Sequence, residues 1–300
     1  MPFLTETQVQ DFREKGFLSL SQIAPPEEVA RIKKIIYALF EKKTGWEQGA
    51  QFDMVGLDDG KAPATSPQII NPVSFAPELE QTQFRTNALA IARELLGVDA
   101  ECSYEHAIYK PPQVGSPTPW HQDEAFRSDA GVEFDAISIW MPFQEVKVEN
   151  GCLEFIPGSH LGEVLSHRSP NNDPRIHALE CDADFDRAVA VACPLPAGGV
   201  TIHHSRTLHC AGANTSRTER CAYVLTFKTP ERPALKRNFH WNANKQTARL
   251  ARRRAWKWRG GVLRALRRKI GNLLSRKGFL PQTTQPIPQG QPSPVNRHDV

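Results

Sequence analysis

The chain has 300 residues, 40% of them hydrophobic, with a formal net charge of +4. This hydrophobic content excludes an intrinsically disordered protein. The length predicts a globular protein with one large domain or two smaller ones. No window offers about 18 uncharged apolar residues and no basic segment with an apolar run opens the chain, so we expect an intracellular, cytoplasmic protein.

Three helices are predicted in the N-terminal third. The first begins at a capping box, with Thr5 as the cap and Gln8 three residues later. The second follows Pro-Pro-Glu-Glu and repeats apolar residues at helical spacing. The predicted helices cover residues 5–16, 25–39 and 81–96. Residues 45–75 are rich in Gly, Asp and Pro, so we expect a loop there, of the kind that often contacts substrate.

From about Glu101 onward the chain consists of short apolar or alternating runs broken by Pro, Gly and Asn. We expect strands at residues 103–109, 136–143, 152–156, 189–193, 200–204 and 221–227. Many short strands at this spacing favour a β-sandwich or barrel over a parallel sheet with crossover helices. The six scattered cysteines form no C-x-x-C pair, which argues against a disulfide framework and a thiolate zinc site.

The charge is distributed unevenly along the chain. From Pro233 onward there are 16 Lys and Arg against one Asp, which gives +15 and leaves −11 for the first 232 residues. We therefore predict an acidic domain over 1–232 and a basic, amphipathic helical extension over 233–280. The Pro- and Gln-rich end, 281–300, cannot bury enough surface to stay ordered alone.

Residues 249–277 of the extension carry one apolar stripe, with basic side chains mostly elsewhere. A cationic amphipathic helix with tryptophans suits an anionic membrane surface, which would place the protein at the inner face of a membrane. Nucleic acid is a second candidate partner, although no specific recognition motif is visible. The third is the acidic body of this or another subunit. The sequence leaves these three open.

The stretch PWHQDEAF places an imidazole and a carboxylate two residues apart. In an extended strand His121 and Asp123 project to one face, so both could bind one ion. Two histidines and one carboxylate form a facial set that leaves coordination positions open for cosubstrate and oxygen. The second histidine has to come from VTIHHSRTLHC, which offers His203, His204 and His209.

The surroundings of these histidines resemble the phytanoyl-CoA dioxygenase family of iron(II)- and 2-oxoglutarate-dependent oxygenases. The resemblance extends from about Leu4 to Thr229 and includes SIWMPFQEVKVENGCLEFIPGSH and AGGVTIHHSRTLHCAGANTS. It implies a mainly β fold, a double-stranded β-helix or jelly-roll, with helices packed on its outside. It also implies Fe(II) as the metal, 2-oxoglutarate as cosubstrate and O2 as oxidant.

On the family's pattern the metal ligands fall on His121, Asp123 and His209, and the arginine for the distal carboxylate of 2-oxoglutarate falls on Arg220. A guanidinium offers a planar fork that matches a carboxylate. An unpaired charge in so apolar a strand would be costly, and a bound dicarboxylate would satisfy it. The alternative for Arg220 is a structural ion pair with one of the acids of the body.

Two further residues match positions near the cosubstrate or the iron pocket, Gln122 and Trp140. Trp140 could instead belong to the core. Tyr104, on the strand that leads to Lys110, is a weaker candidate for contact with the cosubstrate, and a structural role is favoured for it. Adjacent residues of a strand face opposite ways, so at most one of His203 and His204 faces the pocket, and we expect His204 either to be structural or to contact a ligand residue from behind.

The resemblance implies a dioxygenase that hydroxylates an aliphatic carbon of a small-molecule or lipid-linked substrate. Retention of Asp123 argues against halogenation, which in related enzymes accompanies loss of the carboxylate. Two alternatives come from other classes: a non-catalytic relative with an unused metal site, and a cupin-like metal enzyme that does not use 2-oxoglutarate. The arginine at position 220 weighs against the second.

Overall fold

The computed structural model describes residues 3–127, 131–237, 239–260 and 262. The sheets and their covering helices belong to one compact unit, Met1–Arg254, and Ala255–Val300 form a second. Most of the stripe predicted within 249–277, and all of the tail predicted over 281–300, lie outside the described residues. Within the described part of the chain, no helix combines the length and the apolar character needed to cross a bilayer.

The three predicted helices are present, with ends within two residues of those expected. They are α1 (Glu6–Lys15), α2 (Pro26–Glu41) and α3 (Gln83–Leu96). The capping box is confirmed: the Thr5 hydroxyl accepts a hydrogen bond from the Gln8 backbone at 3.2 Å, and the Gln8 side chain accepts one from the Thr5 backbone at 2.8 Å. Gly16 ends α1 with φ of 81°, a conformation that glycine adopts without strain.

Seven antiparallel strands form the larger sheet, in the order β1-β12-β7-β14-β4-β3-β2. Their bounds are β1 (Phe17–Leu20), β2 (Gln51–Asp53), β3 (Pro67–Ile70), β4 (Glu101–Lys110), β7 (Ala136–Pro142), β12 (Val200–His204) and β14 (Arg220–Lys228). All its neighbouring strands pair antiparallel.

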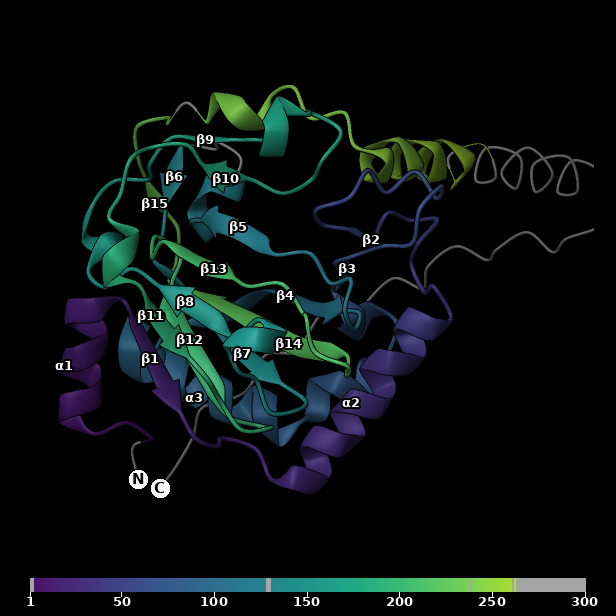
Figure 1. Ribbon diagram of the computed structural model, residues 1–300. Coiled ribbons are helices and arrows are strands. Elements are labelled where there is room, and N and C mark those ends of the chain that lie inside the picture. Colours follow the sequence, from purple (N-terminus) through teal and green to yellow (C-terminus); the bar gives the residue numbers. More distant parts are fainter. Residues whose placement is uncertain (1–2, 128–130, 238, 261, 263–300) are drawn as a thin grey trace, which may run out of the picture. The chain divides into compact units, whose positions relative to one another are not determined.

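The smaller sheet has four antiparallel strands in the order β11-β8-β13-β5 and lies over the larger one (Figure 1). Its strands are β5 (Thr118–His121), β8 (Leu153–Phe155), β11 (Val191–Cys193) and β13 (His209–Ala211). Two short pairs join β9 (His167–Arg168) to β10 (Glu180–Cys181) and β6 (Val132–Glu133) to β15 (Arg232–Pro233). The predicted jelly-roll with outer helices is confirmed.

Short 3-10 helices lie in the connections. They are η1 (Pro72–Ser74), η2 (Pro77–Gln81), η3 (Asp123–Phe126), η4 (Val148–Asn150), η5 (Ser159–Leu161), η6 (Pro170–Asn172), η7 (Arg187–Val189) and η8 (His240–Asn242). All six cysteines are free thiols, five of them buried.

The expectation of a loop over 45–75 is wrong at β2 and β3, which lie within it and extend the larger sheet, whereas the connection between them contains no strand. The Asp53 carboxylate explains how so polar a segment forms strands. It accepts hydrogen bonds from the backbone of Val55, Thr65 and Ser66 at 3.3, 2.9 and 3.1 Å. One side chain thus closes the intervening loop and brings the two strands together.

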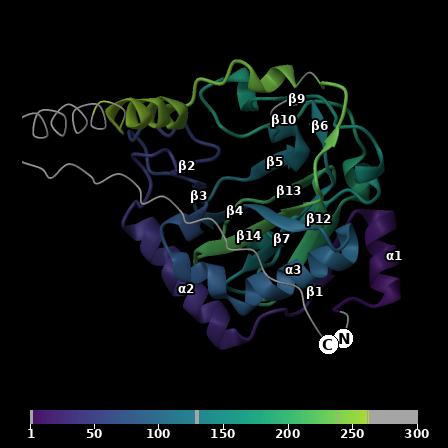
Figure 2. The ribbon, with the colours of Figure 1, turned by 180° about the vertical axis from the view of Figure 1, so that it is seen from behind.

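Strand β14 shows how the two-residue period of a strand assigns side chains to opposite faces. Its odd-numbered residues, from Cys221 to Phe227, are buried in the core beneath the helices. Its even-numbered residues, from Arg220 to Lys228, face the smaller sheet or the cavity between the sheets. Figure 2 shows α2 and α3 across the helix-covered face. The other face is therefore free to carry chemistry.

The described part of the basic extension as far as Arg254 belongs to the same compact unit as the sheets. Arg237 forms an ion pair with Glu124, and Arg252 forms one with Asp58 at 2.5 Å. The Trp241 indole donates a hydrogen bond to a backbone carbonyl at 2.9 Å. For these residues the partner is the protein's own acidic body. A functional boundary after Arg232 stays a prediction.

Candidate active site

Strand β5 ends at His121, and η3 begins at Asp123. Gln122 between them is still extended, with φ of −114° and ψ of 131°. The two side chains therefore leave the chain on one side, as the spacing predicts. His121 Nε2 lies 3.6 Å from Asp123 Oδ1.

His209 completes the cluster from the neighbouring strand β13, where it is the cross-strand partner of His121. Its Nε2 lies 3.7 Å from Asp123 Oδ1, and the two imidazole centroids are 4.2 Å apart. One ligand atom from each of the three residues lies within 4.8 Å of the others. The structure therefore brings together the three residues that the sequence singles out as ligands.

The protonation of the cluster suits a metal ion. His121 Nδ1 lies 2.7 Å from the carbonyl of Pro119, and His209 Nδ1 lies 2.9 Å from that of Thr207. A carbonyl only accepts hydrogen bonds, so each Nδ1 donates its proton there and each Nε2 is the ring nitrogen turned toward Asp123. Burial, together with the neighbouring imidazoles, lowers the pKa of His209 well below its ordinary value. Two imidazole Nε2 atoms beside a carboxylate fit divalent iron.

Two side chains of the larger sheet orient Asp123. Ser138 of β7 donates a hydrogen bond to Asp123 Oδ2 at 2.9 Å, and His203 Nε2 of β12 lies 3.3 Å from the same oxygen. Burial alone would raise the pKa of Asp123, but hydrogen bonds and charges from the surrounding histidines keep it well below its usual range. The ionised carboxylate therefore turns Oδ1 toward His121 and His209. Sequence reasoning missed Ser138, whose only signal is its place between two apolar residues of a strand.

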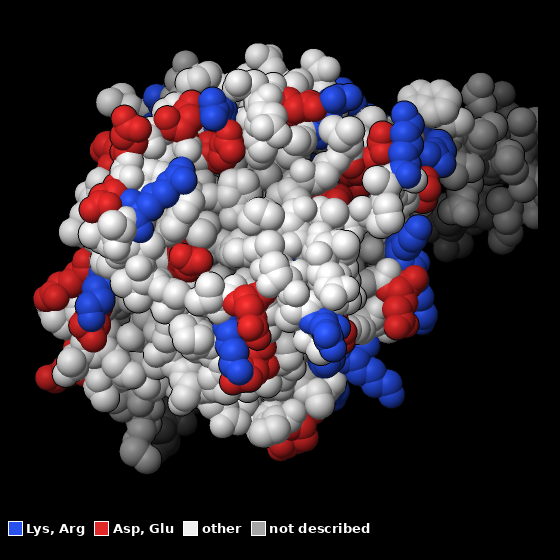
Figure 3. All heavy atoms as spheres, viewed as in Figure 1, with Lys and Arg blue, Asp and Glu red and all other residues white. Residues whose placement is uncertain are grey.

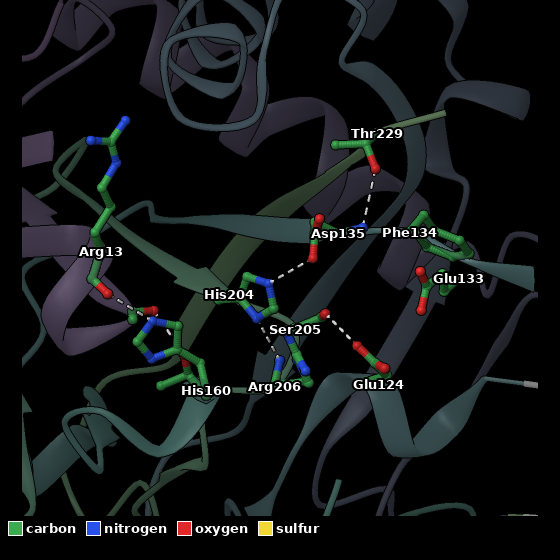
Figure 4. Close-up of polar contacts among 12 residues, drawn as sticks. Arg13, Glu124, Glu133, Phe134, Asp135, His160, His204, Ser205, Arg206 and Thr229 are labelled. Carbon is green, nitrogen blue, oxygen red and sulfur yellow. Dashed lines mark hydrogen bonds and ion pairs between the residues drawn. The ribbon is translucent and has the colours of Figure 1, made fainter. Parts of the chain in front are cut away.

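His204 follows His203 in β12 and therefore faces the other side of the sheet. There it points toward Asp135 (Figure 4). Its Nε2 lies 3.6 Å from Asp135 Oδ1, and its Nδ1 accepts a hydrogen bond from the Arg206 backbone at 3.1 Å. Its ring contacts that of His160, which bonds in turn to the carbonyl of Arg13 at 3.1 Å. His204 joins elements of the fold away from the ligand cluster, as expected.

Ser138→Ala is expected to weaken metal binding by about 10-fold, because outer hydrogen bonds to ligating groups typically contribute 10- to 100-fold to metal affinity. Titration of the protein with Ni²⁺ would measure the change. Ser103→Ala is the matched control, because Ser103 also lines the cavity but its hydroxyl bonds to the carbonyl of Thr226. Equal metal affinity of Ser138→Ala and wild type would contradict this role.

A cavity of about 720 Å³ lies beside the ligand cluster, between the two sheets. Arg220 is 1% exposed in its wall, and its guanidinium lies 5.4 Å from the Trp140 ring. Nη2 donates to the carbonyl of Gly151 at 3.1 Å, whereas Nε and Nη1 are buried without a hydrogen-bond partner. Burial lowers the pKa of Arg220 to about 10, so it is charged at neutral pH. Within the described part of the chain no carboxylate pairs with it, so it fits an anionic ligand.

Lys110 is a second buried cation that the sequence did not single out. It is 0% exposed and lies opposite Arg220 on the adjacent strand β4. Its ammonium donates to the carbonyls of Ala211 and Gly212 at 3.1 and 2.6 Å. Burial and the charge of Arg220 lower the pKa of Lys110 well below its ordinary value. Lys110 thus anchors the segment that follows His209.

The three weaker candidates lie in different places. Trp140 and Tyr104 line the cavity, and the Trp140 indole nitrogen has no hydrogen-bond partner among the described residues. Gln122 is fully buried, and the structure does not bring it to the cavity wall. Its side chain donates to the carbonyl of Arg206 and accepts from the backbone of Leu165, both at 2.7 Å. Its amide therefore holds two loops together.

Comparison with known proteins places this geometry in a family. The model of the phytanoyl-CoA dioxygenase family matches residues 12–222. A probable alpha-ketoglutarate-dependent hypophosphite dioxygenase of Stutzerimonas stutzeri is 26% identical over 216 residues, 71% of this chain and 74% of that protein. Phytanoyl-CoA dioxygenase domain-containing protein 1 of Danio rerio is 24% identical over 263 residues, covering 75% and 90% of the two chains.

Solved structures agree. EvdO2 from Micromonospora carbonacea var. aurantiaca, crystallised with 2-oxoglutarate, is 36% identical with a TM-score of 0.68, covering 79% of this chain and 96% of that one. The carbocyclase SnoK from nogalamycin biosynthesis shares the fold, at 23% identity and a TM-score of 0.58, covering 78% and 88%. The chain belongs to the phytanoyl-CoA dioxygenase family of iron(II)- and 2-oxoglutarate-dependent oxygenases.

Proposed function

We propose that this dioxygenase hydroxylates an aliphatic carbon of a small-molecule substrate, with His121, Asp123 and His209 as the iron ligands. The family uses Fe(II), 2-oxoglutarate and O2. The observation that carries the assignment is that the three ligands and the unpaired Arg220 line one cavity. A non-catalytic or cupin-like protein, the alternative from sequence, does not agree with membership of a 2-oxoglutarate-dependent family.

The residues of the chain position the reactants and keep the site dry. Arg220 binds the distal carboxylate of 2-oxoglutarate, with the Trp140 ring beside the guanidinium. Ser138 and His203 hold the Asp123 carboxylate toward the metal. When bound, iron and 2-oxoglutarate supply the oxidising chemistry, in which O2 is consumed and succinate and carbon dioxide are released.

We also propose that the catalytic domain of residues 1–232 is completed by the start of the basic extension. Asn242, Lys245, Arg249 and Leu250 line the same cavity as the metal ligands. Their backbone belongs to the compact unit that ends at Arg254. The extension therefore contributes to the substrate wall.

The test separates hydroxylation from other outcomes of the same oxidising chemistry. The protein is incubated with Fe(II), 2-oxoglutarate, isotopically labelled O2 and a library of small molecules, and products are analysed by mass spectrometry. Hydroxylation retains one labelled oxygen atom in the product and forms succinate. A product without label would instead indicate ring closure or epimerisation, the activities that the names of two structural neighbours carry. Absence of succinate with every compound would contradict the proposed function.

A further inference from the structure

The lining of the cavity is strongly biased in charge. Asp123, a proposed metal ligand, is the one carboxylate among the described residues that line it. The cationic residues lining it are Arg127, Arg220, Lys228, Lys245 and Arg249. The outer face seen in Figure 3 shows no such bias, because Lys and Arg lie there beside Asp and Glu. The excess of positive charge in the cavity is therefore not shared by that face.

Three of the five cations have an anionic partner, in the structure or under the proposed function. Arg127 pairs with Glu124 at 3.2 Å, and Lys228 pairs with Glu231 at 2.7 Å. Arg220 is assigned to the distal carboxylate of 2-oxoglutarate. Lys245 and Arg249 have no carboxylate partner within the described residues. They are therefore the two cations of the cavity wall that could face an anionic group of the substrate.

The ammonium group of Lys245 uses its hydrogen bonds on neutral oxygen atoms of the protein. Its ammonium donates to the Ser169 hydroxyl at 2.9 Å and to the carbonyls of Ile176, His177 and Ala178 at 2.9, 3.2 and 2.8 Å. Burial lowers its pKa to about 8. Lys245 therefore fixes the loop that carries His177 at the cavity wall. Its charge makes the electrostatic potential of the cavity more positive, but it has no N–H group left to donate to a ligand.

Arg249 is held firmly but keeps N–H groups to offer. Its Nε donates to the carbonyl of Gly49 at 2.9 Å, and its guanidinium lies 4.4 Å from the Phe52 ring. Nη1 lies 3.4 Å from Nε2 of His177, whose pKa is lowered to about 3 by burial and by the charges of Arg249 and Lys245. The neutral imidazole thus accepts from Arg249.

No carboxylate of the described residues lies within ion-pair distance of Arg249. Asp58 influences Arg249 electrostatically, but its carboxylate is bonded to Arg252 at 2.5 Å. The unused N–H groups of Arg249 therefore form a preorganised site for an anion, and preorganisation reduces the entropy lost on binding. Phe52, Met54, Phe126 and Leu250 provide an apolar wall around it.

We propose that the substrate has an apolar body and a single anionic group, a carboxylate or a phosphate, that pairs with Arg249. This inference rests on the proposed function and names the substrate class of that site. Tyr104 and His106, whose rings lie 5.3 Å apart, line the same cavity as Arg249 and Asp123. A substrate anchored at Arg249 would lie along them, with its apolar part between the anchor and the metal.

The test uses matched probes that differ only in charge. Naphthoate and the neutral naphthamide are titrated into the full chain loaded with redox-inert Ni²⁺, with and without saturating 2-oxoglutarate, by isothermal calorimetry. Naphthoate is expected to bind about 10- to 100-fold more tightly than naphthamide, because a hydrogen-bonded ion pair contributes that much. Naphthyl phosphate, as a third probe, distinguishes phosphate from carboxylate as the preferred group.

Arg249→Met removes the charge but keeps an unbranched stem over Phe52. It should abolish the preference for naphthoate and leave naphthamide binding unchanged. Arg254→Met, at an exposed position five residues further along the chain, is the control and should retain the preference. Equal binding of the two probes to wild type, or equal weakening of both by Arg249→Met, would overturn the inference. If 2-oxoglutarate fails to bind but the preference depends on Arg249, the proposed function falls and the anion site stands.

Discussion

Replacing His209 with alanine is expected to abolish the absorption band that Fe(II) and 2-oxoglutarate form together in the absence of oxygen. His209 Nε2 is one of three proposed ligand atoms that lie close together, the others coming from His121 and Asp123. Without His209, the two remaining ligands would bind a divalent ion weakly. The loss of metal affinity should exceed the roughly 100-fold upper range known for outer-shell partners. Anaerobic titration followed by visible absorption measures both the band and the affinity.

Two controls separate ligand loss from damage to the fold. His209 is buried in β13 beside Phe155, so alanine leaves a cavity. His209→Leu fills that space and should lose the band equally. His240→Ala removes an exposed histidine and should behave as wild type. A normal band in both His209 variants would rule out His209 as a ligand.

Arg220→Leu is expected to raise the concentration of 2-oxoglutarate needed for the band by about 100-fold, because a charge-assisted bidentate contact is lost. The same substitution should not destabilise the protein in the absence of cosubstrate. The wild-type guanidinium is buried with Nε and Nη1 unpaired, which already costs stability. Arg220→Lys keeps a charge without the planar fork and should fall between the two.

Thermal unfolding with and without 2-oxoglutarate distinguishes the two effects. At a concentration of 100 times Kd the cosubstrate should stabilise the wild type by about 2.7 kcal/mol, and Arg220→Leu should lose this increment. Arg217→Leu, at an exposed position of the connection that precedes β14, is the control. Unchanged 2-oxoglutarate affinity in Arg220→Leu, accompanied by a large loss of stability, would assign Arg220 a structural role instead.

The local elements of the fold could be predicted because their signals are local. The capping box at Thr5, the αL glycine at position 16 and the alternation along β14 each depend on neighbours in sequence. The segment 45–75 could not, because its strands depend on the Asp53 carboxylate, which bonds to backbone groups up to 13 residues away. The high content of Gly, Asp and Pro correctly indicates the connection between the two strands, but it gives no sign of the strands on either side.

The candidate site was predictable in part for the same reason. The spacing of His121 and Asp123 is a local signal, but the pattern alone left three histidines open, and only the family resemblance favoured His209. Register supports that choice, because β13 places His209 opposite His121. Residues such as Ser138 and Arg249 carry no local signal, since their partners come from distant segments. The sequence left the partner of the basic extension open, because hydrogen bonds to backbone carbonyls leave no trace in sequence.

The edge strand β1 has a consequence for how the protein is made. It pairs with β12, with Phe17 opposite His203, and the Thr207 hydroxyl bonds to the carbonyl of Gly16 across 191 residues. During synthesis β1 therefore stays without its pairing partner until β12 has left the ribosome, when most of the jelly-roll has already been made. Such distant pairings make folding slow and leave strand edges open to aggregation. Iron bound by the proposed ligands could be loaded only late, because those residues meet once β13 has been made.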